Sequence, residues 1–212
     1  MTDQRLADGL SEQLASWRAE LQGGAQRVGW KIAFNLAAVR DAIGIDRPTI
    51  GYLTSATRLE DGADYSAAGA SRLVAEPEIA VEIGEDGGIA SYAPAIELAD
   101  FNRPFDELQA IVAEDIFHRG VIFGAPLPEL DGPPEARVVI NGEERDSARA
   151  PDDYFDGVVE LTASLLGENG ESLRPGDRII CGVITAPVPV VAGDAVTVEF
   201  GPPGSLNVRI TD

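Results

Sequence analysis

Several residue types are scarce in this chain of 212 residues, and each scarcity argues against a class of function. The single cysteine, Cys181, cannot form an intrachain disulfide, and with His118 as the only histidine the chain does not suit structural zinc. Acidic residues outnumber basic ones, 36 to 16, so the net charge of −20 should repel nucleic acid and anionic membranes. No apolar run approaches a membrane span and no targeting segment is evident, so we expect a cytoplasmic protein.

Lysine is the scarcest basic side chain. Lys31 is the only lysine, and all other basic residues among the 16 are arginines. Arginine cannot replace lysine where a compact ammonium or a titratable amine is required. Retention of Lys31 therefore hints at a function, although a strong compositional bias could also leave one lysine anywhere.

The hydrophobic patterns predict an α+β protein that is rich in strands and has few helices. Apolar residues at helical spacing predict an amphipathic helix over 4–21, and a strand follows over 28–34. Asn35 is expected to cap a short helix that ends at Gly44. The clearest strand covers 72–83.

The second half of the chain continues this pattern. We expect a returning strand over 91–100, a short helix over 104–114 and a hairpin with an Asn-Gly turn at 141–142. Asp152 should cap a helix that runs to Leu166. No linker divides the chain, so we expect a single domain over 1–212, with an N-terminal helix in 1–24 and a catalytic core over 28–212.

Two carboxylates interrupt the apolar strand 72–83. Glu76 and Glu78 are two residues apart, so they should point to the same face of the strand. If they are buried, their repulsion must be neutralised, and a hard divalent cation with oxygen ligands suits that role. Pro77 lacks an N–H, so we expect this strand at an edge or a bulge. Taken alone, a solvent-facing side of an amphipathic strand explains the pair at least as well.

A third carboxylate, Glu97, follows the apolar stretch 93–96 in the next predicted strand. It could join Glu76 and Glu78 to complete a site for Mg²⁺ or Mn²⁺.

Four short motifs then follow one another in a recognisable order. They are Gly29-Trp30-Lys31-Ile32-Ala33-Phe34-Asn35, Ile50-Gly51-Tyr52-Leu53, Ala75-Glu76-Pro77-Glu78-Ile79-Ala80 and Tyr92-Ala93-Pro94-Ala95-Ile96-Glu97. This order resembles the fumarylacetoacetate hydrolase superfamily, in the branch of the 2-keto-4-pentenoate hydratases and 4-oxalocrotonate decarboxylases. The resemblance covers residues 28–212.

The resemblance implies a mixed β-roll with a few peripheral helices, and a bound Mg²⁺ or Mn²⁺. By position, Glu76, Glu78 and Glu97 match the metal ligands of the family, and Lys31 matches its catalytic lysine. Thr185 matches a threonine in a family segment expected to bind substrate. The metal would chelate a small 2-oxo acid and stabilise its enolate.

Two roles for Lys31 follow from this arrangement. Beside a cation, its pKa should be lowered, and the amine could move protons. The alternative role is a fixed countercharge for the carboxylates.

The chain departs from the family near the substrate. A family Asp before a Phe-Gly pair is absent from Pro48-Thr49-Ile50-Gly51, and a serine-containing segment is replaced by residues 114–120. We therefore expect His118 to replace a lost acid–base group and Arg119 to bind a substrate carboxylate. A surface histidine at a helix end is the alternative.

The leading hypothesis is a metal-dependent lyase, a hydratase-like enzyme, which forms homo-oligomers as the family does. Decarboxylation is the runner-up because it needs the same enolate but no positioned water. Carbon–carbon hydrolysis and tautomerisation also fit, and an inactive partner subunit is a different class of explanation.

Overall fold

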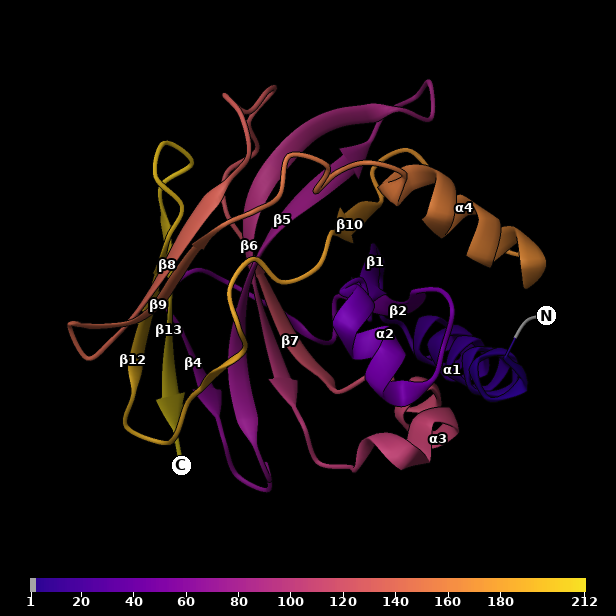
Figure 1. Cartoon of the computed structure of the whole chain (residues 1–212), viewed down its shortest axis with the longest axis horizontal. Helices are drawn as coiled ribbons and strands as arrows, with labels where there is room; N and C mark the ends of the chain where they lie inside the picture. Colours follow the sequence, from indigo (N-terminus) through magenta and orange to yellow (C-terminus); the bar gives the residue numbers. More distant parts are fainter. Residues whose placement is uncertain (1–2) are drawn as a thin grey trace.

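The computed structural model describes residues 3–212, so Met1 and Thr2 of the predicted domain lie outside it. The described chain forms two β-sheets with helices gathered at one end (Figure 1). The helices are α1 (Gln4–Gln22), α2 (Ala37–Ile43), α3 (Leu108–Ala113) and α4 (Val158–Glu168), with a 3₁₀ turn η1 (Phe105–Glu107). Each helix in this part of the chain is too short or too polar to cross a membrane.

The larger sheet carries most of the long strands. Its spatial order is β2 (Thr49–Thr54), β1 (Arg27–Ala33), β10 (Arg178–Ile180), β5 (Leu73–Ile83), β6 (Ile89–Asp100), β7 (His118–Phe123) and β3 (Arg58–Leu59), with β11 (Val188–Pro189) also paired to β5. The smaller sheet has the order β4 (Ala63–Ser66), β13 (Ser205–Thr211), β12 (Ala195–Glu199), β8 (Glu135–Ile140) and β9 (Glu143–Arg149). The expected β-rich α+β architecture is confirmed.

Helix α1 shows how the apolar pattern produces the packing. Its buried stripe includes Leu6, Leu10, Leu14 and Trp17, at the spacing of one helix face. The helix packs on α3 and β2. The Gln13 side chain donates a 2.8 Å hydrogen bond to the Val112 carbonyl and so joins α1 to the end of α3.

Two predicted helix starts are wrong. Helix α2 is preceded by Leu36 rather than Asn35, and no side chain caps it. Helix α4 starts at Val158 after Gly157, which has a left-handed conformation, because residues 152–157 form turns instead of a helical first turn. Asp152 therefore caps nothing in α4. The predicted end of α2 is confirmed, since Gly44 closes the helix with φ of 72°.

The expectation that Pro77 marks a sheet edge is also wrong. Strand β5 lies inside the larger sheet, with β6 along one side and β10 and β11 along the other. Strand β11 pairs with Val74 and Ala75, and β10 begins its pairing at Ala80, so Pro77 faces the gap between them. The Pro77 carbonyl accepts from the Ile184 N–H in that gap, where a ladder donor is not needed.

Candidate active site

The pairing of β5 with β6 brings the three predicted glutamates together. Glu76 lies directly opposite Glu97, and Glu78 is two residues further along the same face. Glu78 and Glu97 are each 2% exposed, and Glu76 is partly buried. The face is therefore not solvated, and the amphipathic-strand explanation of these acids is wrong.

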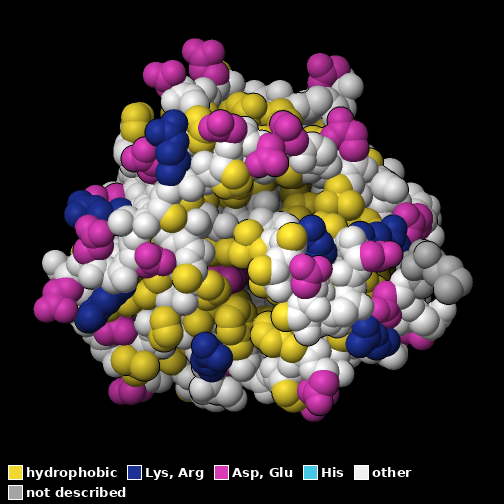
Figure 2. All heavy atoms as spheres, viewed as in Figure 1, with side chains coloured by type: hydrophobic (Ala, Val, Ile, Leu, Met, Phe, Trp, Pro, Cys, Tyr) yellow, Lys and Arg dark blue, Asp and Glu magenta, His cyan; other side chains and the backbone are white. Residues whose placement is uncertain are grey.

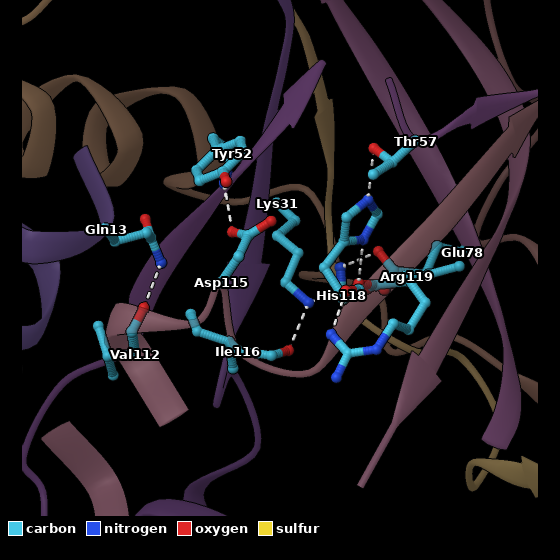
Figure 3. A network of polar contacts seen from close by, with 12 residues as sticks. Gln13, Lys31, Tyr52, Thr57, Glu78, Val112, Asp115, Ile116, His118 and Arg119 are labelled. Carbon is cyan, nitrogen blue, oxygen red and sulfur yellow. Dashed lines mark hydrogen bonds and ion pairs between the residues drawn. The ribbon is translucent and has the colours of Figure 1, made fainter. Parts of the chain in front are cut away.

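Lys31 reaches this cluster from β1. Its ammonium donates to Glu97 Oε1 at 2.5 Å and to the Ile116 carbonyl at 2.9 Å, and the side chain is buried (Figure 3). A buried ammonium needs such partners, because an unpaired one loses its hydration without compensation. The only lysine of the chain is thus an ion-pair partner of the predicted third ligand.

A glycine on β2 makes room for this contact. Gly51 is the pairing partner of Lys31, and a Cβ at Gly51 would lie 2.6 Å from Asp115 Oδ1 and 2.8 Å from Lys31 Cγ. Both distances are shorter than real side-chain contacts allow. The family-like Gly51 therefore lets the Lys31 stem and the Asp115 carboxylate pass close to the strand.

The turn between α3 and β7 has an unusual backbone. Asp115, Ile116 and Phe117 have φ values of 61°, 50° and 66°, which are left-handed conformations that L-residues rarely adopt. Each such residue costs about 1–3 kcal/mol, and such strain tends to collect at functional sites. Here the turn presents the Ile116 carbonyl to Lys31, and Asp115 Oδ1 accepts from the Tyr52 N–H at 2.8 Å (Figure 3).

Asp115 is a site residue that sequence reasoning did not select. Burial raises the pKa of its carboxyl to about 7, although His118 and Lys31 act in the opposite direction. Its neighbours Ile116 and Phe117 are not turn-forming residue types, so no local signal in the sequence indicated this turn.

Glu78 is held by the chain that follows β10. Its Oε2 accepts from the Gly182 N–H at 2.7 Å. Gly182 has φ of 107°, and a Cβ there would lie 2.3 Å from the side-chain nitrogen of Asn35. Only glycine fits this position, so Gly182 fixes one oxygen of Glu78 while Asn35 packs against it.

His118 lies next to the cluster. Its Nδ1 is 2.8 Å from Glu97 Oε1 and its Nε2 is 3.0 Å from Thr57 Oγ1 (Figure 3). Because an ionised carboxylate can only accept, Nδ1 carries the proton of that hydrogen bond. The imidazole is buried, so it is not the surface histidine of the alternative reading.

Two other predicted residues point elsewhere. Arg119 donates to the His118 carbonyl at 2.8 Å, and its guanidinium is 3.9 Å from Asp100. The Thr185 hydroxyl donates to the Ala186 carbonyl at 2.9 Å.

A cavity of about 180 Å³ opens above the glutamates. Figure 2 shows the corresponding face, where apolar side chains border a central hollow. Its lining consists of Lys31, Ile32, Ala33, Phe34, Asn35, Leu36, Val39, Glu76, Glu78, Glu97, Phe101, Phe105, Ile116, Phe117, Val183 and Pro187. The structure therefore brings Lys31 and the three glutamates to one cavity, while His118, Arg119 and Thr185 are outside its lining.

Burial and mutual repulsion disfavour ionisation of two of the glutamates. Burial, with the charge of Glu97, raises the pKa of Glu76 to about 8. The same burial, with the charges of Glu97 and Glu76, raises the pKa of Glu78 well above its usual range. Lys31 acts in the opposite direction on both glutamates but does not outweigh burial and repulsion.

Lys31 and Glu97 form the compensated part of the cluster. Burial alone would lower the pKa of Lys31, but Glu97 and Asp115 outweigh it and the pKa is raised. Burial would likewise raise the pKa of Glu97, but Lys31 and His118 hold it below its usual range. The surrounding carboxylates thus favour the charged ammonium of Lys31, and the lowered pKa expected beside a bound cation stays a prediction.

The chemistry of these donors fits a hard divalent cation. Mg²⁺ prefers carboxylate oxygens, and it would supply the positive charge that Glu76 and Glu78 lack. Within residues 3–212, no three acidic, histidine or cysteine side chains are already arranged as one metal cluster. Glu97 instead accepts from Lys31 and His118.

Known proteins with similar sequences are enzymes of two kinds, a decarboxylase and a hydratase. No family model matches the chain. It is 28% identical over 96% of its length to 4-oxalocrotonate decarboxylase of Pseudomonas putida, covering 84% of that protein. It is 26% identical over 89% of its length to 2-hydroxyhexa-2,4-dienoate hydratase of Comamonas testosteroni, covering 80% of that protein.

Solved structures with a similar fold point to the same group of enzymes. The 4-oxalocrotonate decarboxylase from P. putida G7, complexed with magnesium and adipate, matches with a TM-score of 0.86 at 27% identity, over 97% of this chain and 86% of that one. Fumarylpyruvate hydrolase from Pseudomonas aeruginosa, in complex with Mn²⁺ and pyruvate, shares the fold with a TM-score of 0.65 at 19% identity, over 88% and 90% of the two chains. The fold is that of the fumarylacetoacetate hydrolase superfamily. Within it, the relatives support the hydratase and decarboxylase branch inferred from the motifs.

Proposed function

We propose that this protein is a divalent-metal-dependent lyase that acts on a short 2-oxo or 2-enol carboxylic acid. The observation that carries the proposal is the group of three glutamates at the base of one cavity, two of which lack a positive partner. Relatives named as a decarboxylase and a hydratase, and a magnesium complex of the former, support the same reading.

The glutamates are proposed as the metal ligands. Glu76, Glu78 and Glu97 would hold Mg²⁺ or Mn²⁺, which when bound supplies Lewis acidity for the enolate oxygen of the substrate. The Gly182 N–H fixes one oxygen of Glu78. The mostly apolar lining lowers the local dielectric, which strengthens electrostatic interactions at the base.

Lys31 is proposed to act as a cationic group that holds or returns a proton at Nζ. It lines the cavity, and Glu97 and the Ile116 carbonyl fix the direction of its ammonium. An ammonium in this place would favour negative charge that develops on the substrate.

His118 is better suited to positioning Glu97 than to the acid–base role expected from the sequence. Its two ring nitrogens are occupied by Glu97 and Thr57, and it does not line the cavity. A hydrogen bond from the far side of a metal-binding carboxylate orients that ligand. Arg119 and Thr185, expected to bind substrate, are directed at backbone carbonyls, and we propose no contact between them and the substrate.

Hydration and decarboxylation need the same stabilised enolate. An assay of substrate turnover distinguishes the two reactions by their products. Purified protein with Mg²⁺ is given a panel of 2-oxo and 2-hydroxydienoic acids, while enol absorbance and CO₂ release are followed. Loss of enol with formation of a product that has gained one water, and no CO₂, identifies a hydratase, and CO₂ release identifies a decarboxylase. An absence of any metal-dependent turnover would contradict the proposal and favour the inactive-partner reading.

We also propose, on the family resemblance, a cytoplasmic homo-oligomer. Light scattering on the eluate of a gel-filtration column would measure its mass, and a mass of one chain would contradict the oligomer.

A further inference from the structure

The peptide group that holds Glu78 belongs to a glycine with little restraint of its own. The Gly182 N–H donates to Glu78 Oε2 at 2.7 Å. Gly182 follows the end of β10, whose pairing with β5 stops at Ile180 and Ala80, so it lies beyond the paired residues. Glycine adopts positive φ values, such as the 107° found here, about as readily as negative ones. The direction of this N–H therefore depends on contacts from outside the segment.

Tyr154 supplies such a contact at the carbonyl of the same glycine. It lies in the turns between β9 and α4. Its hydroxyl donates to the Gly182 carbonyl and accepts from the Ile79 N–H at 3.3 Å. Because Ile79 is the residue after Glu78 in β5, one hydroxyl joins the strand that carries the glutamate to the chain that holds its carboxylate. Gly182 is thus hydrogen-bonded at both its N–H and its C=O, which restricts rotation of both peptide groups.

The Tyr154 side chain is anchored in the core. It is 8% exposed, and its ring packs against that of Phe155 with the centroids 4.9 Å apart. Burial, together with the charge of Glu78, raises the pKa of the hydroxyl well above its usual range, so the group stays a donor. Within residues 3–212, the lining of the cavity does not include Tyr154. Tyr154 can therefore act on Glu78 through Gly182, but not on a substrate in the cavity.

We propose that Tyr154 is a positioning residue for the metal site. Its hydroxyl fixes Gly182, and the Gly182 N–H in turn fixes the Glu78 carboxylate in the direction that a divalent cation needs. The inference rests on the proposed function, because it takes Glu78 as a metal ligand. Hydrogen bonds behind a metal ligand account for about 10- to 100-fold in metal affinity.

The choice of cation gives a readout that is specific to positioning. Mg²⁺ demands near-ideal octahedral geometry, whereas Ca²⁺ accepts more ligands in flexible arrangements. A loosely held Glu78 should therefore cost more affinity for Mg²⁺ than for Ca²⁺. A general loss of structure would weaken the binding of both ions alike.

Calorimetric titration of Mg²⁺ and Ca²⁺ into wild type and Tyr154→Phe tests the proposal. The substitution keeps the buried ring and removes only the hydroxyl. We expect the Mg²⁺ affinity to fall at least about tenfold and the Ca²⁺ affinity to fall less than about threefold. An Mg²⁺ affinity equal to that of wild type, or an equal loss for both ions, would overturn the inference.

Tyr92→Phe is the matched control. The Tyr92 ring packs against that of Phe155 with the centroids 5.1 Å apart, but the hydroxyl at the Gly182 carbonyl is that of Tyr154. This variant should bind both ions as wild type does. The same selective loss of Mg²⁺ in Tyr92→Phe would contradict a specific role for Tyr154.

A second variant isolates the Gly182 contact, and it decides the question if Tyr154→Phe does not fold. 4-Aminophenylalanine at position 154 keeps a donor for the Gly182 carbonyl but is a poor acceptor for the Ile79 N–H. Its Mg²⁺ affinity should stay within about threefold of wild type. A loss of about tenfold or more would contradict positioning through Gly182.

The wild-type titration separates this inference from the proposed function. If wild type does not bind Mg²⁺, the proposed metal site itself fails. If wild type binds Mg²⁺ and Tyr154→Phe binds it equally well, only the positioning role of Tyr154 fails.

Discussion

The substitution Gly51→Ala should damage the site through a single methyl group. The new Cβ would lie 2.6 Å from Asp115 Oδ1, 2.8 Å from Lys31 Cγ and 2.9 Å from Lys31 Cε. All of β2 is buried, so neither neighbour can move into solvent. Overpacking of this kind costs about 1–3 kcal/mol of unfolding free energy. A shift of about 1 Å in Lys31 would reduce kcat about 100-fold.

Urea denaturation and steady-state kinetics on Gly51→Ala measure the two effects. Gly167→Ala is the matched control, because a Cβ at this position in α4 meets nothing within 4 Å. That control should be neutral or gain about 0.5–1 kcal/mol, as for glycine replaced within a helix. The reasoning is refuted if Gly51→Ala is as stable and as active as Gly167→Ala.

The remaining predictions concern His118 and Asp115. His118→Ala should weaken Mg²⁺ binding, measured by calorimetry, about 10- to 100-fold, Thr57→Val should weaken it less, and His118→Asn should restore part of the loss. A lower kcat with unchanged Mg²⁺ affinity would instead indicate the acid–base role. The pKa of Asp115 is about 7 in the folded protein and 3.8 in the unfolded chain, so between these pH values the folded state binds the extra proton. The stability that this proton contributes is lost as the pH rises from about 4 to 7. Asp115→Asn keeps an acceptor for the Tyr52 N–H but cannot titrate. Between pH 4 and 7, the unfolding free energy of wild type should therefore fall by up to about 4 kcal/mol relative to that of Asp115→Asn. The same pH dependence of unfolding free energy in both proteins would contradict this.

The acidic cluster was predictable because it depends on strand geometry. The two-residue spacing of Glu76 and Glu78 fixes their common face, and a returning strand brings Glu97 beside them. The position of Pro77 was misjudged because its missing N–H falls between β11 and β10, two short strands that are separate in the sequence from β5.

The rest of the site depends on contacts that no local pattern encodes. Asp115 enters through a left-handed turn without glycine, which the surrounding structure imposes. The role of His118 depends on the irregular register between β6 and β7, which places the imidazole beside Glu97 rather than in the cavity. Sequence patterns indicate which residues share a strand face, but not which side of a neighbouring carboxylate a side chain approaches.

The central claim is that Glu76 and Glu78 hold a divalent cation. The most direct measurement is calorimetric titration of Mg²⁺ into wild type, Glu76→Gln, Glu78→Gln and the control Glu82→Gln. Glu82 is on the same strand but outside the cavity, where Arg178 pairs with it at 3.2 Å. We predict that wild type and Glu82→Gln bind Mg²⁺ alike and that Glu76→Gln and Glu78→Gln lose at least about tenfold in affinity. Equal Mg²⁺ affinity in all four proteins would contradict the account.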